Sequence, residues 1–372
     1  MRGMMRDVLI ALAPASMAGI YFFGWRAAVL MAVCIGVAVG SEWACRKLMR
    51  RENTIGDLSA VVTGLLLALN LPPGLPFWQA ILGTVVAIVI AKQIFGGLGY
   101  NPFNPALIGR AFLLVSFAAT MTTWSESDWM KESLEKETMD AMSQADIDAL
   151  ATATPLGMSQ ETFKALAMEP ADVLATMGHD ADAWKTGHGE TDATASASPH
   201  EHSEAPTSIE MSLVSTLMWE WTPKLKWRLF IGDVNGCIGE TSALALLLGG
   251  LFLLFRRVIT WHVPVAYIGT VAVFAFVMQL AMPSLSLPVS VHLLAGGLML
   301  GALFMATDPV TSPVTRCGLL IFGVGCGLLT MVIRIVPGGA YPEGVSFAIL
   351  IMNALTPLIN KACKPKKFGA SK

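Results

Sequence analysis

The sequence predicts an all-α polytopic membrane protein with about ten transmembrane helices. Three observations favour this class over a soluble protein. Hydrophobic residues make up 54% of the 372 residues and charged residues only 14%, whereas an average soluble domain has roughly 25% charged residues. Long apolar stretches follow one another closely along most of the chain. Lys and Arg also concentrate in the short segments on one side of these stretches, as in the cytoplasmic loops of membrane proteins.

Ten apolar stretches are candidates to cross a bilayer, five before the polar segment 122–226 and five after it. Several are only 14–17 residues long, which is short for a hydrocarbon core of ~30 Å. The second stretch follows the first at once, so we expect the N-terminus to be a transmembrane helix and not a cleaved signal. The stretches are Val8–Phe23, Ala27–Ala44, Leu58–Leu71, Phe77–Ile94, Ala106–Thr122, Thr241–Phe255, Val265–Met282, Val289–Ala306, Leu319–Ile335 and Val345–Leu358.

Proline and glycine break some of these stretches. Pro72, Pro73 and Gly74 end the third, and the run from Asn101 to Pro105 opens the fifth. Broken segments at membrane depth are tolerated where they face protein or a water-filled cavity. We therefore expect some helices to span only part of the bilayer.

A weak internal repeat divides the chain into two halves of five stretches. Thr63–Leu69 and Gly296–Ala302 match in composition and order, as do Gly96–Pro102 and Gly338–Gly344. An odd number of spans gives the two halves opposite topology, as in transporters built from inverted repeats. We predict repeats at 1–121 and 227–360, a basic tail at 361–372, and a urea-transporter-like arrangement of broken helices.

The distribution of Lys and Arg predicts the orientation. Fifteen fall in short segments on the side of the N-terminus and two, Arg26 and Arg334, on the other. This asymmetry places both termini in the cytoplasm and the segment 122–226 outside. In this topology Arg110 lies at the cytoplasmic start of the fifth span, and Glu240 lies near the outer interface.

The segment 122–226 is an acidic insert with a net charge of −13, whereas the rest of the chain carries +11. Its part 178–208 is of low complexity and has no periodic apolar face, so we predict disorder. His200 and His202 flank Glu201 there, but no apolar residues nearby would fix a metal site, and we predict no metal. The composition also excludes a nucleic-acid binder.

The six cysteines form no C-x-x-C pair. An iron–sulfur cluster held by one chain needs four nearby cysteines, or two with two histidines. We therefore expect small unpaired residues, and a cluster shared with another subunit stays open. The chain also has no G-x-G-x-x-G dinucleotide loop.

A threonine in the insert stands out. The run Ala151-Thr152-Ala153-Thr154-Pro155 surrounds the Thr154 hydroxyl with small residues. Pro155 biases Thr154 toward an extended backbone, which would expose the hydroxyl to a modifying enzyme. On the residues alone, an ordinary loop rich in Ser and Thr is the favoured interpretation.

Several motifs resemble those of one family of membrane redox subunits. The chain is similar to the D subunit of Rnf electron transport complexes and to the related B subunit of sodium-translocating NADH:quinone reductases. Its first span begins by Val8, which favours the Rnf protein over the longer B subunit. The matching segments are Ala13–Ala15, Gly19–Gly24, Asn101–Ala106, Gly236–Leu244, Phe304–Thr311 and Gly338–Val345.

The resemblance implies FMN bound by a phosphoester to a threonine that closes an S/T-G-A-T motif. The matching residue here is Thr154, although Ala151 and Thr152 depart from the motif. Thr194 is a weaker competitor, because it lacks the following Pro-Leu and lies in the low-complexity part. Flavinylation implies an extracytoplasmic flavin transferase, which agrees with the predicted outside placement. A second, non-covalent riboflavin stays open.

The resemblance also implies a function and partners. The chain would relay electrons through FMN and couple them to Na⁺ or H⁺ movement in the bacterial cytoplasmic membrane, as a subunit that is not catalytically autonomous. Its partners would be a G-type flavoprotein, the A and E membrane subunits, the cluster-bearing B and C subunits, and membrane lipid. A solute channel of the urea-transporter type is the alternative, since the inverted repeat alone fits it.

Five polar residues at membrane depth are candidates for a flavin pocket or an ion path. For Asn101, Asn104 and Asp308 a structural role such as helix capping is the favoured interpretation. Glu240 and Thr241 open the sixth span, and the Glu240 carboxylate is harder to explain as a cap. No catalytic triad or general base is expected.

Overall fold

The computed structural model describes residues 1–123, 227, 229–232, 236–281, 288–335 and 344–364. All regular elements in these residues are helices, which confirms the all-α prediction for this part of the chain. The insert lies almost wholly outside the described residues. The predictions for Thr154, Thr194, the histidines and the low-complexity part 178–208 therefore stay predictions.

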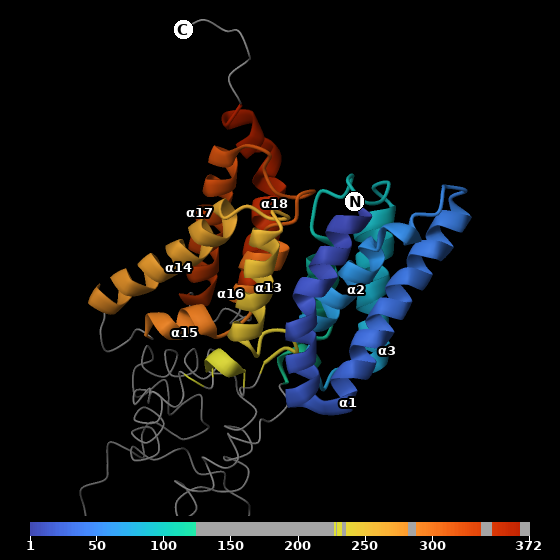
Figure 1. The fold of residues 1–372 in the computed structure, drawn as a ribbon, viewed down its shortest axis with the longest axis horizontal. Coiled ribbons are helices and arrows are strands. Elements are labelled where there is room, and N and C mark those ends of the chain that lie inside the picture. The colour runs from blue at the N-terminus through green and yellow to red at the C-terminus, as the bar shows by residue number, and fades with distance from the viewer. Residues whose placement is uncertain (124–226, 228, 233–235, 282–287, 336–343, 365–372) are drawn as a thin grey trace, which may run out of the picture.

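Helix α1 (Arg2–Leu48) contains both of the first two predicted stretches. It is interrupted at Gly24, whose φ of 69° and ψ of −160° lie outside the helical region. Glycine adopts a positive φ without the penalty that a Cβ imposes. Figure 1 shows the result: the two arms of α1 run in opposite directions and join at one end of the molecule.

The rest of the first half consists of shorter helices. α2 (Ser59–Leu69) is followed by the proline-rich loop, and α3 (Phe77–Val85) continues into the π-helical η2 (Val86–Gln93). α4 (Pro105–Ser116) and the short α5 (Ala118–Thr122) complete it. α2 and α4 are thus the partial-length helices that the Pro/Gly breaks predict.

The second half is also broken. It contains α13 (Ala243–Phe255), α14 (His262–Ala281), α17 (Arg316–Ile335) and α18 (Val345–Ala362). The predicted stretch Val289–Ala306 is instead three pieces. These are α15 (Val289–Leu294), α16 (Leu298–Leu300) and the π-helical η3 (Gly301–Met305).

Four helices in the described residues are long and apolar enough to cross a membrane, namely α1, α14, α17 and α18. Shorter apolar helices of 10–17 residues are α2, α3 with η2, α4 and α13. The helices therefore agree with a membrane protein. The total of ten spans and the inverted repeat stay predictions.

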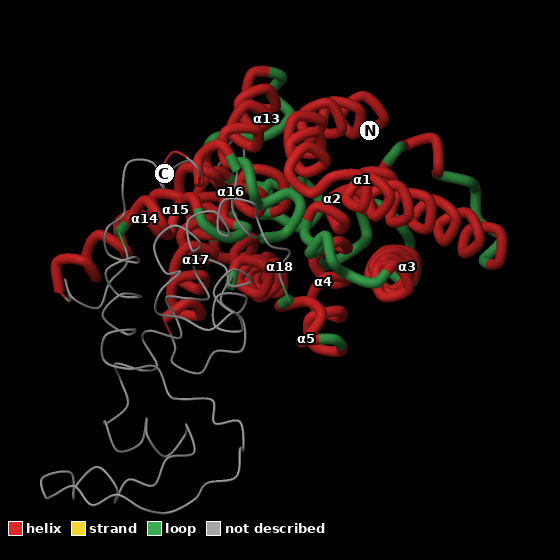
Figure 2. The backbone as a smooth tube through the Cα atoms, turned by 90° about the horizontal axis from the view of Figure 1, so that it is seen from below, coloured by secondary structure: helices red, strands yellow, loops and turns green. Residues whose placement is uncertain are grey.

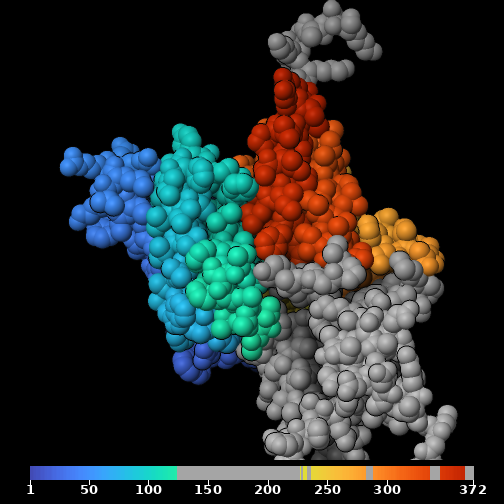
Figure 3. Space-filling model, turned by 180° about the vertical axis from the view of Figure 1, so that it is seen from behind, coloured from blue at the N-terminus to red at the C-terminus, as the bar shows by residue number. Residues whose placement is uncertain are grey.

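The two halves lie side by side, as the blue-green and orange-red groups in Figures 1 and 3 show. They meet through α1 with α13 and through α4 with α18.

Within the first half, small residues allow α1 and α2 to pack closely. A Cβ on Gly64 would lie 2.8 Å from the Cys34 carbonyl oxygen of α1, so only glycine permits this approach of α2. Figure 2 shows loop segments lying between α16 and α2, near the centre of the molecule.

Candidate functional site

A buried ion pair joins the two halves at their centre. Arg110 lies on α4 and Glu240 in the loop before α13, and Nη1 of Arg110 is 3.1 Å from Oε1 of Glu240. The two residues are only 2% and 6% exposed. The same Nη1 donates a hydrogen bond of 2.6 Å to Oδ1 of Asn70, directly after α2. Nη2 lies 3.5 Å from Sγ of Cys237.

The loop that carries Glu240 is held by the end of α2. Backbone N–H groups of Ile238 and Gly239 donate to the carbonyls of Leu71 and Leu69, at 3.1 and 2.7 Å. A Cβ on Gly239 would lie 2.6 Å from Cβ of Leu69, so this register needs glycine. These bonds keep the loop at the broken end of α2.

Ser242 ends the loop by capping α13, because its Oγ accepts from the N–H of Ala245 at 3.2 Å. A capping side chain satisfies one of the N–H groups that the first helical turn leaves unpaired. The position of Glu240 therefore follows from two local features, the pairing of its loop with α2 and the start of α13.

The ion pair corrects the depths predicted from the sequence. Arg110 and Glu240 were expected at opposite faces of the membrane, yet they contact each other. The reason is that α2, α4 and α13 are all short, so the ends of broken helices meet inside the protein. The backbone N–H and C=O groups at such buried helix ends form their hydrogen bonds with neighbouring parts of the protein.

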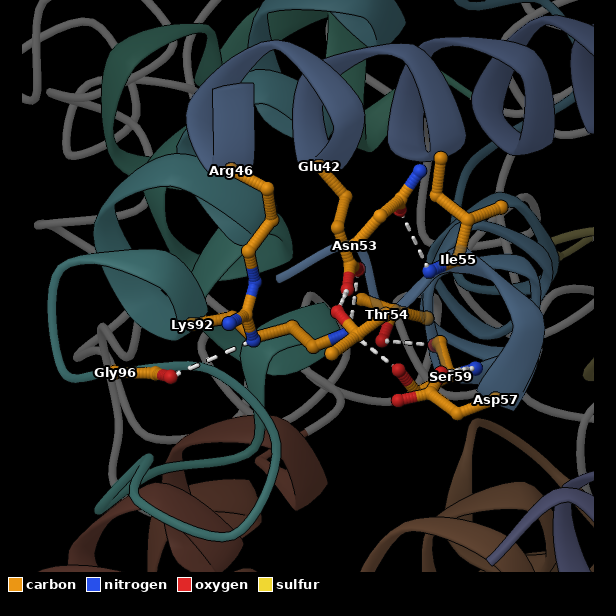
Figure 4. Close-up of polar contacts among 10 residues, drawn as sticks. Glu42, Arg46, Asn53, Thr54, Ile55, Asp57, Ser59, Lys92 and Gly96 are labelled. Carbon is orange, nitrogen blue, oxygen red and sulfur yellow. Dashed lines mark hydrogen bonds and ion pairs between the residues drawn. The ribbon is translucent and has the colours of Figure 1, made fainter. Parts of the chain in front are cut away.

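A second buried ion pair lies between α1 and η2 and was not predicted (Figure 4). Nζ of Lys92 is 2.7 Å from Oε2 of Glu42, and the side chains are 1% and 0% exposed. The same Nζ donates to Oγ of Ser59 at 2.6 Å. Thr54 Oγ1 donates to the other Glu42 oxygen at 2.7 Å. A glutamate near the end of an apolar stretch is the sequence signal that could have revealed this pair.

A cavity of about 80 Å³ lies beside this second pair. It brings together three of the predicted residues, because Asn101, Asn104 and Asp308 line it along with Lys92 and Thr307. This volume has room for a few water molecules. It is smaller than the ~300 Å³ of small ligand pockets.

The predicted residues around the cavity make the structural contacts expected of them. Asn104 Oδ1 accepts from the Ala106 N–H at 3.0 Å and caps α4. Asp308 Oδ1 accepts from the Val310 N–H at 3.1 Å. Asn101 Nδ2 donates to the Phe103 carbonyl at 3.0 Å. These hydrogen bonds agree with the structural interpretation, and the same residues also line the cavity, so their role in a pocket or an ion path stays a prediction.

The central pair and the cavity are connected through Met305 at the end of η3. Asn104 Nδ2 donates to the Met305 carbonyl oxygen at 3.3 Å, and Asn70 Nδ2 lies 3.5 Å from the Met305 sulfur. Thr241 is placed apart from the cavity, with Oγ1 3.4 Å from the Ile238 carbonyl. Glu240 and the three cavity residues therefore belong to two linked polar regions.

The described residues contain no group of three or more His, Cys, Asp or Glu side chains placed to hold a metal ion. The polar centre is built from ion pairs and amides. Buried charges in a membrane protein are costly unless paired, and by default they indicate a functional pathway.

The model of the NQR2, RnfD, RnfE family matches residues 1–369. The chain belongs to this family. The resemblance seen in the sequence motifs is thereby confirmed.

Members of the family with similar sequences cover nearly the whole chain. One is the D subunit of the Na⁺-translocating ferredoxin:NAD⁺ oxidoreductase complex of Acetobacterium woodii, 40% identical over 99% of this chain and 91% of that protein. Another is the D subunit of the proton-translocating ferredoxin:NAD⁺ oxidoreductase complex of Clostridium ljungdahlii, 38% identical over 98% and 91%. A third is the D subunit of the ion-translocating oxidoreductase complex of Escherichia coli, 35% identical over 98% and 93%.

Proposed function

We propose that this chain is the D-type membrane subunit of a redox-driven, ion-translocating ferredoxin:NAD⁺ oxidoreductase complex. The observation that carries the proposal is similarity along the full length to proteins that are named as D subunits of such complexes. The chain acts as part of a complex and not alone. The other subunits supply the contacts to ferredoxin and NAD⁺, because this sequence has neither a ferredoxin-like cluster motif nor a dinucleotide loop.

FMN is bound covalently to Thr154 in this proposal. The run Ala151–Leu156 supports it, since the hydroxyl of Thr154 has small neighbours and precedes proline. The excess of Lys and Arg in the opposite loops supports an outside position for the insert, where an extracytoplasmic flavin transferase reaches it. When bound, the flavin supplies one-electron chemistry, while the protein sets its position.

The ion path passes through the polar regions at the centre of the molecule. Its support is the cavity beside Lys92, lined by Asn104, Thr307 and Asp308, and the buried Arg110–Glu240 pair beyond it. Relatives are named both for Na⁺ and for protons, so membership of the family does not specify the ion.

The attachment of FMN is tested by mapping peptides of the chain after expression with its flavin transferase. The expected result is the mass of FMN on the peptide that contains Thr154, and its loss in Thr154→Ala. Thr154→Ser keeps a hydroxyl and retains partial labelling. Thr152→Ala is the matched control and labels normally.

Other outcomes of the map contradict the proposal in different ways. FMN on Thr152 or Thr194 would move the attachment site but leave the family function. If the chain itself, purified after expression with the flavin transferase, showed no flavin absorbance, a solute channel would be favoured instead. Because the sequence predicts a surface loop around Thr154, we expect Thr154→Ala to change the free energy of unfolding by no more than ~0.5 kcal/mol, and co-purification with the other subunits checks that loss of the label does not reflect misfolding.

A further inference from the structure

Two cysteine thiols lie beside each other at neighbouring ends of α17 and α18. The Cys363 thiol donates a hydrogen bond to Cys317, with the two sulfurs 3.5 Å apart. Both cysteines are free, Cys317 exposed and Cys363 half-buried. They are 46 positions apart in the chain, which is why the sequence suggested unpaired residues.

Two hydrogen bonds join the backbone near Cys317 to side chains of α18 near Cys363. The Val314 N–H donates to Oδ1 of Asn360 at 3.1 Å. One turn earlier on α18, Thr356 Oγ1 donates to the Thr311 carbonyl at 3.0 Å. These bonds fasten the loop before α17 along the last turns of α18, so the contact between the sulfurs results from a fixed register of the two elements.

We propose that Cys317 and Cys363 form a reversible dithiol–disulfide site whose oxidant is a peroxide or a low-molecular-weight disulfide. A disulfide needs a sulfur separation of ~2.05 Å, so the sulfurs must approach by about 1.5 Å. This movement is within reach of two side chains at helix ends, one of which is exposed on the surface of the chain.

The chemistry balances with hydrogen peroxide as oxidant. The Cys317 sulfur attacks one peroxide oxygen, the O–O bond breaks, and a sulfenic acid and one water form. The Cys363 sulfur then attacks the Cys317 sulfur, the S–O bond breaks, and a second water leaves. Each sulfur loses one electron, each peroxide oxygen gains one, and the two thiol protons end in the two waters.

The exposure of the two residues sets this order of attack. Cys317 is exposed and meets the oxidant first. The hydrogen bond to Cys317 raises the pKa of the Cys363 thiol. This arrangement corresponds to an accessible cysteine with a neighbouring resolving cysteine.

Oxidation of the two cysteines would affect the candidate ion path through the loop before α17. The loop contains Asp308, which lines the cavity, and Thr311 and Val314, which bond to α18. A disulfide at the start of α17 would fix this loop against α18 covalently. We therefore expect oxidation to restrict movement of the cavity wall.

The experiment treats membranes that contain the complex with hydrogen peroxide, blocks remaining thiols with N-ethylmaleimide, and maps the cysteine peptides by mass. The expected result is one cross-linked species joining Cys317 to Cys363, lighter by two hydrogen atoms and lost on reduction with dithiothreitol. Maleimide labelling of these two cysteines is lost, while labelling of the half-buried Cys45 persists. The readout is independent of flavin and of electron transfer, so it fails or succeeds separately from the proposed function.

Serine variants supply the matched controls. Cys363→Ser should abolish the cross-link and leave Cys317 as a sulfenic or higher acid, whereas Cys45→Ser should leave the cross-link unchanged. Co-purification with the other subunits checks that each variant still assembles. Three results would each overturn the proposal. Both cysteines could remain fully labelled by maleimide after peroxide treatment, both could be oxidised to sulfenic or higher acids without a disulfide between them, or the disulfide could join two copies of the chain.

Discussion

Lys92 and Glu42 lie 50 positions apart, yet Nζ of Lys92 is 2.7 Å from the Glu42 carboxylate in a fully buried contact. Ser59 accepts a second hydrogen bond from Nζ, and Thr54 donates to the glutamate. The contact therefore ties η2 to the second arm of α1 beside the start of α2. Such a pair is costly to break, because each charge would be left in a medium of low dielectric.

Replacing Lys92 by methionine should strongly destabilise the protein. The variant leaves the Glu42 carboxylate buried without its cation, which costs about 3–5 kcal/mol. Adding Glu42→Gln should restore much of this loss, since the unpaired charge is removed. The temperature at which the purified complex unfolds in detergent measures both effects, and equal stability of the single and double variants would contradict the explanation.

The ion pair between Asp7 and Arg256 provides the comparison. The Arg256 side chain is 48% exposed and lies 3.1 Å from the carboxylate. The Asp7 side chain is 10% exposed, so only one partner of this pair is open to its surroundings, and Arg256→Gln should cost less than Lys92→Met, where both partners are buried. The same unfolding measurement, made beside Lys92→Met, tests whether burial determines the size of the effect.

Glu240→Gln should separate ion movement from assembly. The amide oxygen can still accept from Arg110, which keeps the contact between the two halves, while the negative charge on the proposed ion path is lost. The Arg110 guanidinium loses its buried countercharge, so we expect a lower unfolding temperature for the assembled complex. We expect the complex to assemble with electron transfer retained and ion uptake reduced. Parallel assays of both activities in proteoliposomes measure this, and unchanged ion uptake would exclude Glu240 from the path.

Gly249→Ala should disturb the contact between α13 and α1. A methyl group at this position would meet the Ala11 carbonyl oxygen and lie 2.9 Å from Cζ of Phe304. Overpacking of this kind costs about 1–3 kcal/mol. Gly269→Ala on α14 is the matched control, because nothing lies within 4 Å of the added carbon. A lower unfolding temperature is expected for the first variant only.

Reporters of membrane sidedness test the predicted orientation. A reporter fused after Ala193 should be active only outside the cytoplasm, and one fused after Lys372 only inside. The physical reason is the concentration of Lys and Arg in the loops on one side. Activity of both reporters on the same side would contradict the arrangement of ten spans.

Several features of the fold could be predicted because they depend on neighbours in the sequence. Apolar runs predict the helices, and Pro72 and Pro105 mark where α2 ends and α4 begins. Asn104 is recognisable as a cap from its position before proline and an apolar run. The break between α15 and α16 has only glycines as a signal, and it was missed.

The contacts of the candidate site could not be predicted, since they join residues far apart in the chain. Glu42 with Lys92 and Cys317 with Cys363 each depend on how two helices align. Arg110 and Glu240 were placed at opposite faces because counting charges treats every apolar stretch as a full span, and their contact contradicts this placement. A helix that starts inside the protein moves its charged residues away from the interface.

The distance in sequence between Arg110 and Glu240, 130 positions, has a consequence for biosynthesis. At ~5–20 residues per second, the ribosome needs on the order of 10 s to reach the glutamate after it has made the arginine. During this interval the whole acidic insert is synthesised, and in the predicted orientation it must also cross the membrane. The guanidinium of α4 is therefore synthesised before the carboxylate that pairs with it, and the contact between the two halves can form only after the second half has begun to emerge.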